Sequence, residues 1–211
     1  MSENSKQSFA AMLVGDVFAS MHRRELHDSQ ASRRDLVRTS FAAIEGFVWI
    51  FREHIVEAAD STYGLTEEES QVLAENSYQV NDQGRINAQP KFLPMLSQVR
   101  LIARIAARIA PEAEIDFSGS DWKSMREAVR VRNRITHPKT TADLELSKGD
   151  VDRSVSAFFW FGEAASSAME HANVAVHGYL GLFKDVLEKL KAGDPETTLL
   201  YQYIAKSGDE S

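Results

Sequence analysis

Apolar residues alternate at spacings of four and three along two long stretches of this sequence. The first stretch, from about Ser32 to Ala59, carries Val37, Phe41, Ile44, Val48, Phe51 and Ile55. The second begins near Ser147, with Asp150 as its capping partner, and carries Val151, Val155, Phe158, Gly162, Ala165, Met169 and Ala172. This alternation is typical of helices that pack along other helices, and small residues in the second stretch permit close helix approach. It predicts an all-α fold, and we expect these stripes also to mediate a two-fold homodimer.

The remaining segments also favour helices. We predict helices at about 6–25, 66–76, 90–110, 122–137, 174–190 and 194–205, with 174–190 able to continue the helix before it. The only candidate β element is a small hairpin near 78–87 that turns at Gly84. In 90–110, Arg100, Arg104 and Arg108 share one face, which we interpret as a polar surface, with tracking of an RNA backbone as the alternative. We expect one all-helical domain over residues 1–211.

Composition excludes several classes of site. The chain has 211 residues and 43% hydrophobic content, enough for a well-buried domain. It has no cysteine, which excludes disulfides and thiolate metal sites and fits a reducing cytoplasm. The six histidines are scattered, and no phosphate-binding loop or nucleophile elbow is present. We therefore expect a cytoplasmic protein with no metal, no cofactor and no membrane association.

A basic segment stands out in this acidic chain. Between Trp122 and Lys139, six basic residues and one acidic residue give a local charge of +5, whereas the whole chain carries −7. A concentration of positive charge in an acidic protein is commonly explained by attraction to a phosphate backbone, although a solvated helix face is the simpler alternative. The segment also contains His137, and histidine is the side chain best suited to proton transfer near neutral pH.

Helical geometry sorts the side chains of 122–137 into two arcs. Ser120 or Asp121 is the expected cap, and Pro138 ends the helix because it lacks an N–H. The apolar arc consists of Trp122, Met125, Ala128, Val129, Val131 and Ile135. Arg132 falls near the middle of this arc, where an unpaired charge would be costly, so it requires a carboxylate, a phosphate or carbonyl groups.

The polar edge of the same helix carries a second group of candidates. Asn133, Arg126, His137 and Arg130 line up along it, and Asn133 precedes His137 by four residues, within side-chain reach. A regular helix would separate Arg132 and His137 by roughly 140°, but Pro138 biases His137 away from helical conformation and frees its ring to swing. We expect Arg132, Asn133 and His137 to converge in one cleft beside a two-fold interface.

The sequence Arg132-Asn133-Arg134-Ile135-Thr136-His137 resembles the signature of the HEPN superfamily, an Arg, a polar residue and then a His four to six residues on. A second likeness, from Arg33 through Glu45, is to early HEPN helices that carry an acidic residue facing the site. The resemblance implies a HEPN-like helical bundle at about 30–180 with terminal helices as extensions. It also implies a homodimer in which the motifs meet, and a metal-independent endoribonuclease of toxin, abortive-infection or antiviral type, with a possible antitoxin or defence-system partner. Lys139 stands where toxins paired with nucleotidyltransferase antitoxins have Tyr, which argues against that subgroup.

The resemblance also implies roles for individual residues. His137 is the expected base for the ribose 2′-OH, Arg132 the phosphate clamp, and Asn133 a contact to the His ring or to the phosphate. The residues expected to bind flanking RNA are Arg126, Arg130, Arg134 and Lys139, and those expected to support the site are Glu45 and Arg38. The expected products carry a 2′,3′-cyclic phosphate and a 5′-hydroxyl.

Alternatives remain for two single residues and for the chain as a whole. His137 taken alone fits a histidine that interacts with carbonyls at a helix end, and Glu45 fits a structural ion pair with Arg38 or Arg52. The whole chain could instead be a non-catalytic HEPN-like module that binds a nucleotide or a protein through the same basic groove. It could also be a structural bundle in which an internal acid such as Glu45 satisfies Arg132.

Overall fold

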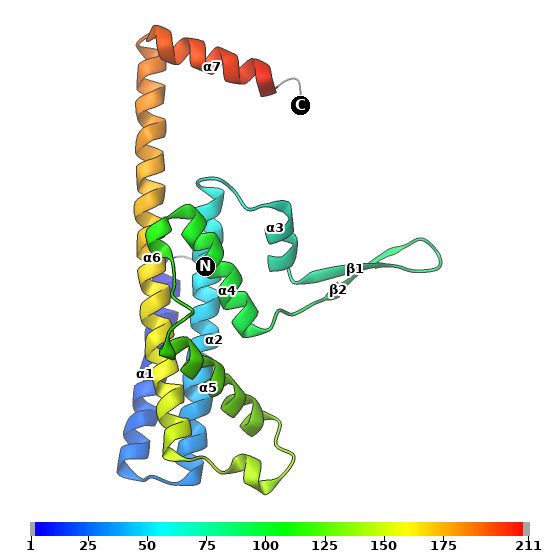
Figure 1. Ribbon diagram of the computed structural model, residues 1–211, viewed down its shortest axis with the longest axis vertical. Helices are drawn as coiled ribbons and strands as arrows, with labels where there is room; N and C mark the ends of the chain where they lie inside the picture. The colour runs from blue at the N-terminus through cyan, green and yellow to red at the C-terminus, as the bar shows by residue number, and fades with distance from the viewer. Residues whose placement is uncertain (1–2, 209–211) are drawn as a thin grey trace. The chain divides into compact units, whose positions relative to one another are not determined.

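The computed structural model describes residues 3–208, and the side chains of residues 9–203. The helices are α1 (Glu3–Leu26), α2 (Gln30–Asp60), α3 (Glu67–Leu73), α4 (Met95–Ile109), α5 (Ser120–Thr136), α6 (Lys148–Lys191) and α7 (Pro195–Gly208) (Figure 1). Strands β1 (Asn76–Val80) and β2 (Ile86–Pro90) form an antiparallel hairpin, and short 3-10 turns lie at Pro111–Ala113 and Thr141–Leu144. The predicted helical fold with one small hairpin is therefore confirmed.

The chain divides into two compact units. Residues up to Ala172 form unit 1, and residues from Asn173 onward form unit 2, so α6 contributes its first part to unit 1 and its last part to unit 2. The expectation of one domain with terminal extensions stays a prediction. Among the described residues, none of the helices combines the length and the apolar character that a membrane span requires.

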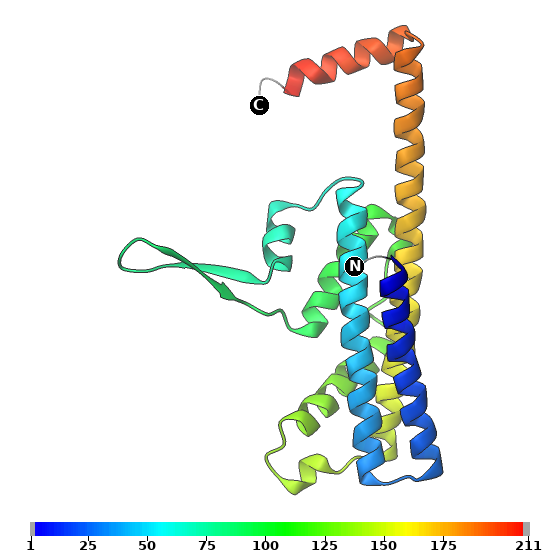
Figure 2. The same cartoon turned by 180° about the vertical axis from the view of Figure 1, so that it is seen from behind.

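Helices α1 and α2 form an antiparallel pair that lies side by side in Figure 2. The Ser29 hydroxyl caps α2 by accepting from the backbone N–H of Ser32 at 3.2 Å. Asp35 of α2 accepts from Ser20 at 2.7 Å and from Arg23 at 2.8 Å, both on α1. The hydrogen bond from Arg23, followed by that from Ser20, lowers the pKa of Asp35.

The core of unit 1 is built from both apolar stripes. The buried positions of α2 include Val37, Phe41, Ile44, Val48, Phe51 and Ile55, and those of α6 include Val151, Phe158, Phe161, Ala165 and Ala172. Phe47 stacks on Phe158 with ring centroids 5.7 Å apart, and Phe51 meets Phe161 edge to face at 6.4 Å. The stripes from which we expected a dimer interface thus face the core of one chain, and the dimer itself stays a prediction.

Three predicted helix boundaries shift for local reasons. Helix α3 ends at Leu73 because Asn76 already begins β1, and α4 begins at Met95 rather than near Pro90, which ends β2. Helix α5 begins at Ser120 with Gly119 in the cap position and no side-chain cap bond, so the predicted cap at Ser120 or Asp121 is wrong. The hairpin turns at Gly84, whose φ of 72° lies in the left-handed region that glycine tolerates.

Candidate functional site

Helix α5 carries the basic motif and packs against α2. Its buried positions are Trp122, Met125, Ala128, Val131 and Ile135, which agrees with the predicted apolar arc. Arg132 lies at the rim of that arc, where its side chain is 31% exposed. Its side chain points toward α2 and not into the core. The burial that its position in the arc suggested is therefore not found, and Arg132 instead contacts a residue of α2 that is distant in sequence.

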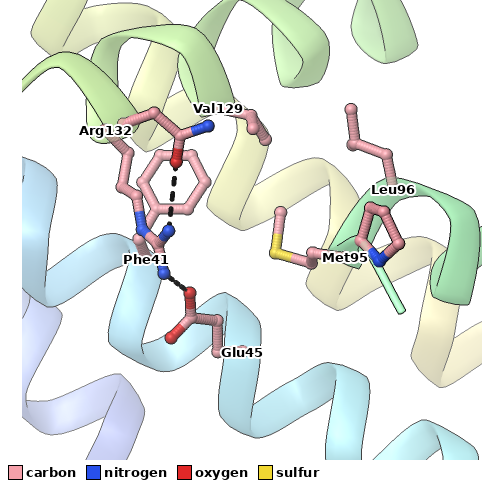
Figure 3. A pocket seen from close by; sticks show the side chains of 8 residues that line it. Phe41, Glu45, Met95, Leu96, Val129 and Arg132 are labelled. Atoms are coloured by element: carbon pink, nitrogen blue, oxygen red, sulfur yellow. Dashed lines mark hydrogen bonds and ion pairs between the residues drawn. The ribbon is translucent and has the colours of Figure 1, made fainter. Parts of the chain in front are cut away.

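Arg132 joins two of the candidate residues. Its guanidinium forms an ion pair with the Glu45 carboxylate and donates through Nη1 to Asn133 Oδ1 at 3.1 Å (Figure 3). Glu45 therefore pairs with Arg132, and neither Arg38 nor Arg52 is its partner. Arg38 instead donates to the carbonyl of Ile135 at 3.3 Å, and Arg52 donates to the carbonyl of Leu73 at 2.6 Å.

These groups form one wall of a pocket of about 250 Å³. The pocket is lined by Phe41, Glu45, Pro94, Met95, Leu96, Val129, Arg132 and Asn133. Figure 3 shows Arg132 and Glu45 facing Met95 and Leu96 of the α4 end across this space. One wall is therefore charged and donates hydrogen bonds, and the opposite wall is apolar, which suits a ligand that combines an anion with a flat organic group.

His137 lies at the end of α5, outside that pocket. It is the C-cap residue, with φ −124° and ψ 58°, and its backbone N–H donates to the carbonyl of Asn133 at 3.0 Å. Its side chain is exposed, and no ring hydrogen bond is found for it within the described residues. In the single chain, Arg132 and Asn133 thus meet at the pocket and His137 does not line it.

A second pocket of about 320 Å³ adjoins the first. It is lined by Leu96, Ser97, Arg100, Trp122 and Arg126, and Leu96 lines both pockets. The Arg100 guanidinium lies 5.2 Å from the centroid of the Phe117 ring and 5.4 Å from that of Trp122. Arg126 is exposed there as expected. From the sequence, Arg100 was interpreted as part of a polar face together with Arg104 and Arg108. The spacing of these residues predicted the shared face but not that Arg100 lines a pocket.

The other predicted RNA contacts lie beyond these pockets. Arg130 is exposed, and among the described residues no ion pair is found for it. Arg134 donates to Asp150 at 3.4 Å. Burial raises the pKa of Asp150, but hydrogen bonds from Ser147 and Arg153 together with the charge of Arg134 outweigh it and lower that pKa. Lys139 is exposed, and its backbone N–H donates to Asp143 at 2.9 Å.

Within the described part of the chain, His, Asp and Glu side chains form no group of three or more that could hold a metal ion. In comparisons with known proteins, no family model, no curated protein and no solved structure matches this chain significantly.

Proposed function

We propose that this chain is a HEPN-like endoribonuclease that cleaves single-stranded RNA without a metal ion. The observation that supports this most is the meeting of Arg132 and Asn133 of α5 with Glu45 of α2 at one pocket, while His137 caps the end of α5. The first two residues of the motif, Arg132 and Asn133, thereby share a pocket with Glu45, the acidic residue of α2 that was expected beside the site. A role in toxin–antitoxin or antiviral defence belongs to the same proposal.

The reaction begins at the ribose 2′-OH next to the cleaved phosphate. His137 accepts the 2′ proton as O2′ forms a bond to phosphorus, and the bond from phosphorus to O5′ breaks. Arg132 stabilises the charge that develops on the non-bridging oxygens, since its planar fork matches two of them. The departing O5′ takes a proton from a second acid, for which His137 of another subunit is the simplest source. Asn133 and Glu45 position the Arg132 guanidinium.

The adjoining pocket supports a position for a second phosphate of the RNA. Arg100 and Arg126 line it together, and no carboxylate is among its lining residues. Two cations that face one space together attract an anion. A phosphate of the same strand, one or two nucleotides from the cleaved bond, has the required charge, and Trp122 supplies an aromatic surface nearby.

The first test is cleavage of labelled single-stranded RNA in excess EDTA. The wild type is expected to cleave, and His137→Ala to lose about 10²–10⁴-fold in rate with unchanged RNA affinity. His22→Ala is the matched control, because His22 is also an exposed histidine on a helix and lies outside the candidate site. Cleavage that EDTA abolishes, or that His137→Ala leaves intact, contradicts the proposal. RNA binding with no cleavage at all would make the chain the non-catalytic relative.

A binding arm tests the RNA path in the same assay. Arg100→Ala and Arg126→Ala are each expected to weaken binding and to reduce the slope of log affinity against log salt by about 1. Arg104→Ala is the control, because Arg104 is exposed on the same helix and does not line either pocket. Equal effects of all three substitutions would mean a diffuse electrostatic attraction and no defined path.

A further inference from the structure

The described part of unit 2 exposes many apolar side chains. None of its residues from Asn173 to Tyr203, the range whose side chains are described, is buried. Eleven large apolar side chains in this range are at least 40% exposed, including Leu182 at 69% and Phe183 at 56%. In proteins, most of the stability of a helix comes from the packing of its apolar face. The surface of unit 2 therefore requires a partner.

The last part of α6 carries the spacing that defines a helix–helix seam. Its positions Val176, Tyr179, Phe183, Val186 and Leu190 are separated by three, four, three and four residues. Leu180 and Leu187 flank the seam at the positions next to it, which widens the apolar face. This is the repeat by which two helices interlock their side chains along their length. Unlike most positions of the two stripes of unit 1, none of these seam positions is buried among the side chains that the structure describes.

The charges beside the seam neutralise one another. Lys184 pairs with Glu188 at 4.0 Å and Lys189 pairs with Asp185 at 2.8 Å, each one helical turn apart. Two acids and two bases thus leave this part of the helix without a strong net field, so it does not select an oppositely charged partner such as a nucleic acid. A partner surface that is itself apolar along a seam and neutral at the edges complements this part of the helix.

We propose that the seam from Val176 to Leu190 is covered by the same seam of a second copy of this chain. A stable interface buries about 800 Å² on each partner, and the six large apolar side chains between Val176 and Leu190 that are at least 40% exposed supply much of an area of that order. The two copies pair through unit 2, with the long helices packed side by side about a two-fold axis. This interface replaces the one expected from the stripes at 37–55 and 151–172, and it does not depend on RNA cleavage.

Light scattering on the full chain tests the proposal. The wild type is expected at twice the chain mass, and Phe183→Glu is expected to weaken association about 100-fold or more, because it places a charge in the apolar seam. Gly181→Glu is the matched control: it introduces the same side chain on the opposite face, where nothing lies within 4 Å of the glycine. It should remain dimeric.

Two further readouts keep the outcome decisive. The chain has no cysteine, so Phe183→Cys, at the middle of the seam, should form a disulfide-linked dimer on mild oxidation while Gly181→Cys should not. Hydrogen exchange should show amides of 173–191 losing protection in Phe183→Glu while those of unit 1 keep it. A wild-type monomer at high concentration with protected seam amides would mean that another part of the same chain covers the seam. A dimer that survives Phe183→Glu would place the interface elsewhere. Either result overturns the proposal.

Discussion

At the scale of single residues, the contact between Arg132 and Glu45 has most consequences for function. Both side chains are partly exposed, at 31% and 46%, and ion pairs of that exposure contribute only about 0–1 kcal/mol to stability. The pair is therefore poorly explained as a structural device alone. It holds the guanidinium at the edge of a pocket, together with the hydrogen bond to Asn133, and keeps its outer N–H groups available for an anion.

Glu45→Gln tests that interpretation. Removing the negative charge beside the proposed phosphate position is expected to increase RNA affinity by up to about tenfold, because a nearby carboxylate repels the phosphate. Cleavage of bound RNA should become slower, since the amide holds Arg132 less firmly, and the free energy of unfolding should change by less than about 1 kcal/mol. Binding isotherms, single-turnover rates and denaturant titrations measure the three quantities.

Glu53→Gln is the control, because it makes the same charge change farther along α2. A stability loss in Glu45→Gln that clearly exceeds 1 kcal/mol, with RNA affinity equal to that of Glu53→Gln, would make Glu45 a purely structural partner of Arg132.

At the scale of elements, the helices follow from the period of apolar residues, and the exceptions follow from local chemistry. The stripe from Val37 to Ile55 is buried as the spacing predicted, and so is the apolar arc of α5 except for Val129, which is half-buried. The start of α4 was placed too early because an apolar count does not register that residues up to Pro90 pair with β1. The α5 cap was misplaced because the helix already begins at Ser120, which leaves Gly119, a residue without a side chain that could accept a hydrogen bond, in the cap position.

Gly162 offers a test of how closely α2 and α6 approach. A Cβ at this position would lie 3.3 Å from Cε2 of Phe47, a residue of α2, so a larger side chain must displace that ring. Gly162→Leu is expected to destabilise unit 1 by about 1–3 kcal/mol, the usual cost of overpacking. Gly178→Leu, in the same helix but with nothing within 4 Å of the glycine, should leave unit 1 unchanged. Urea titrations followed by tryptophan fluorescence measure both, and equal midpoints would contradict the close packing.

At the scale of the whole molecule, the spacing of apolar residues shows that one face of a helix packs against something, but it does not show which surface covers that face. The stripes at 37–55 and 151–172 were interpreted partly as a dimer surface, yet they cover each other within unit 1, whereas the seam in 176–190 was treated only as a helix continuation. The contact between Glu45 and Arg132 joins residues 87 positions apart, and helical geometry within α5 could predict only that Arg132 needed a partner. The exposed position of His137 depends on how the chain leaves α5, which no periodicity encodes.

The central claim is cleavage by the ribose 2′-OH at the α5 motif, and the ends of the RNA fragments test it most directly. Mass spectrometry of fragments produced in excess EDTA should find a 2′,3′-cyclic phosphate on one side of each cut and a 5′-hydroxyl on the other, because the 2′ oxygen replaces O5′ on phosphorus. The rate at which these fragments form should be about 10²–10⁴-fold lower in His137→Ala than in the wild type. Fragments that carry a 5′-phosphate and a 3′-hydroxyl, or cyclic ends formed equally well by His137→Ala, would contradict the mechanism.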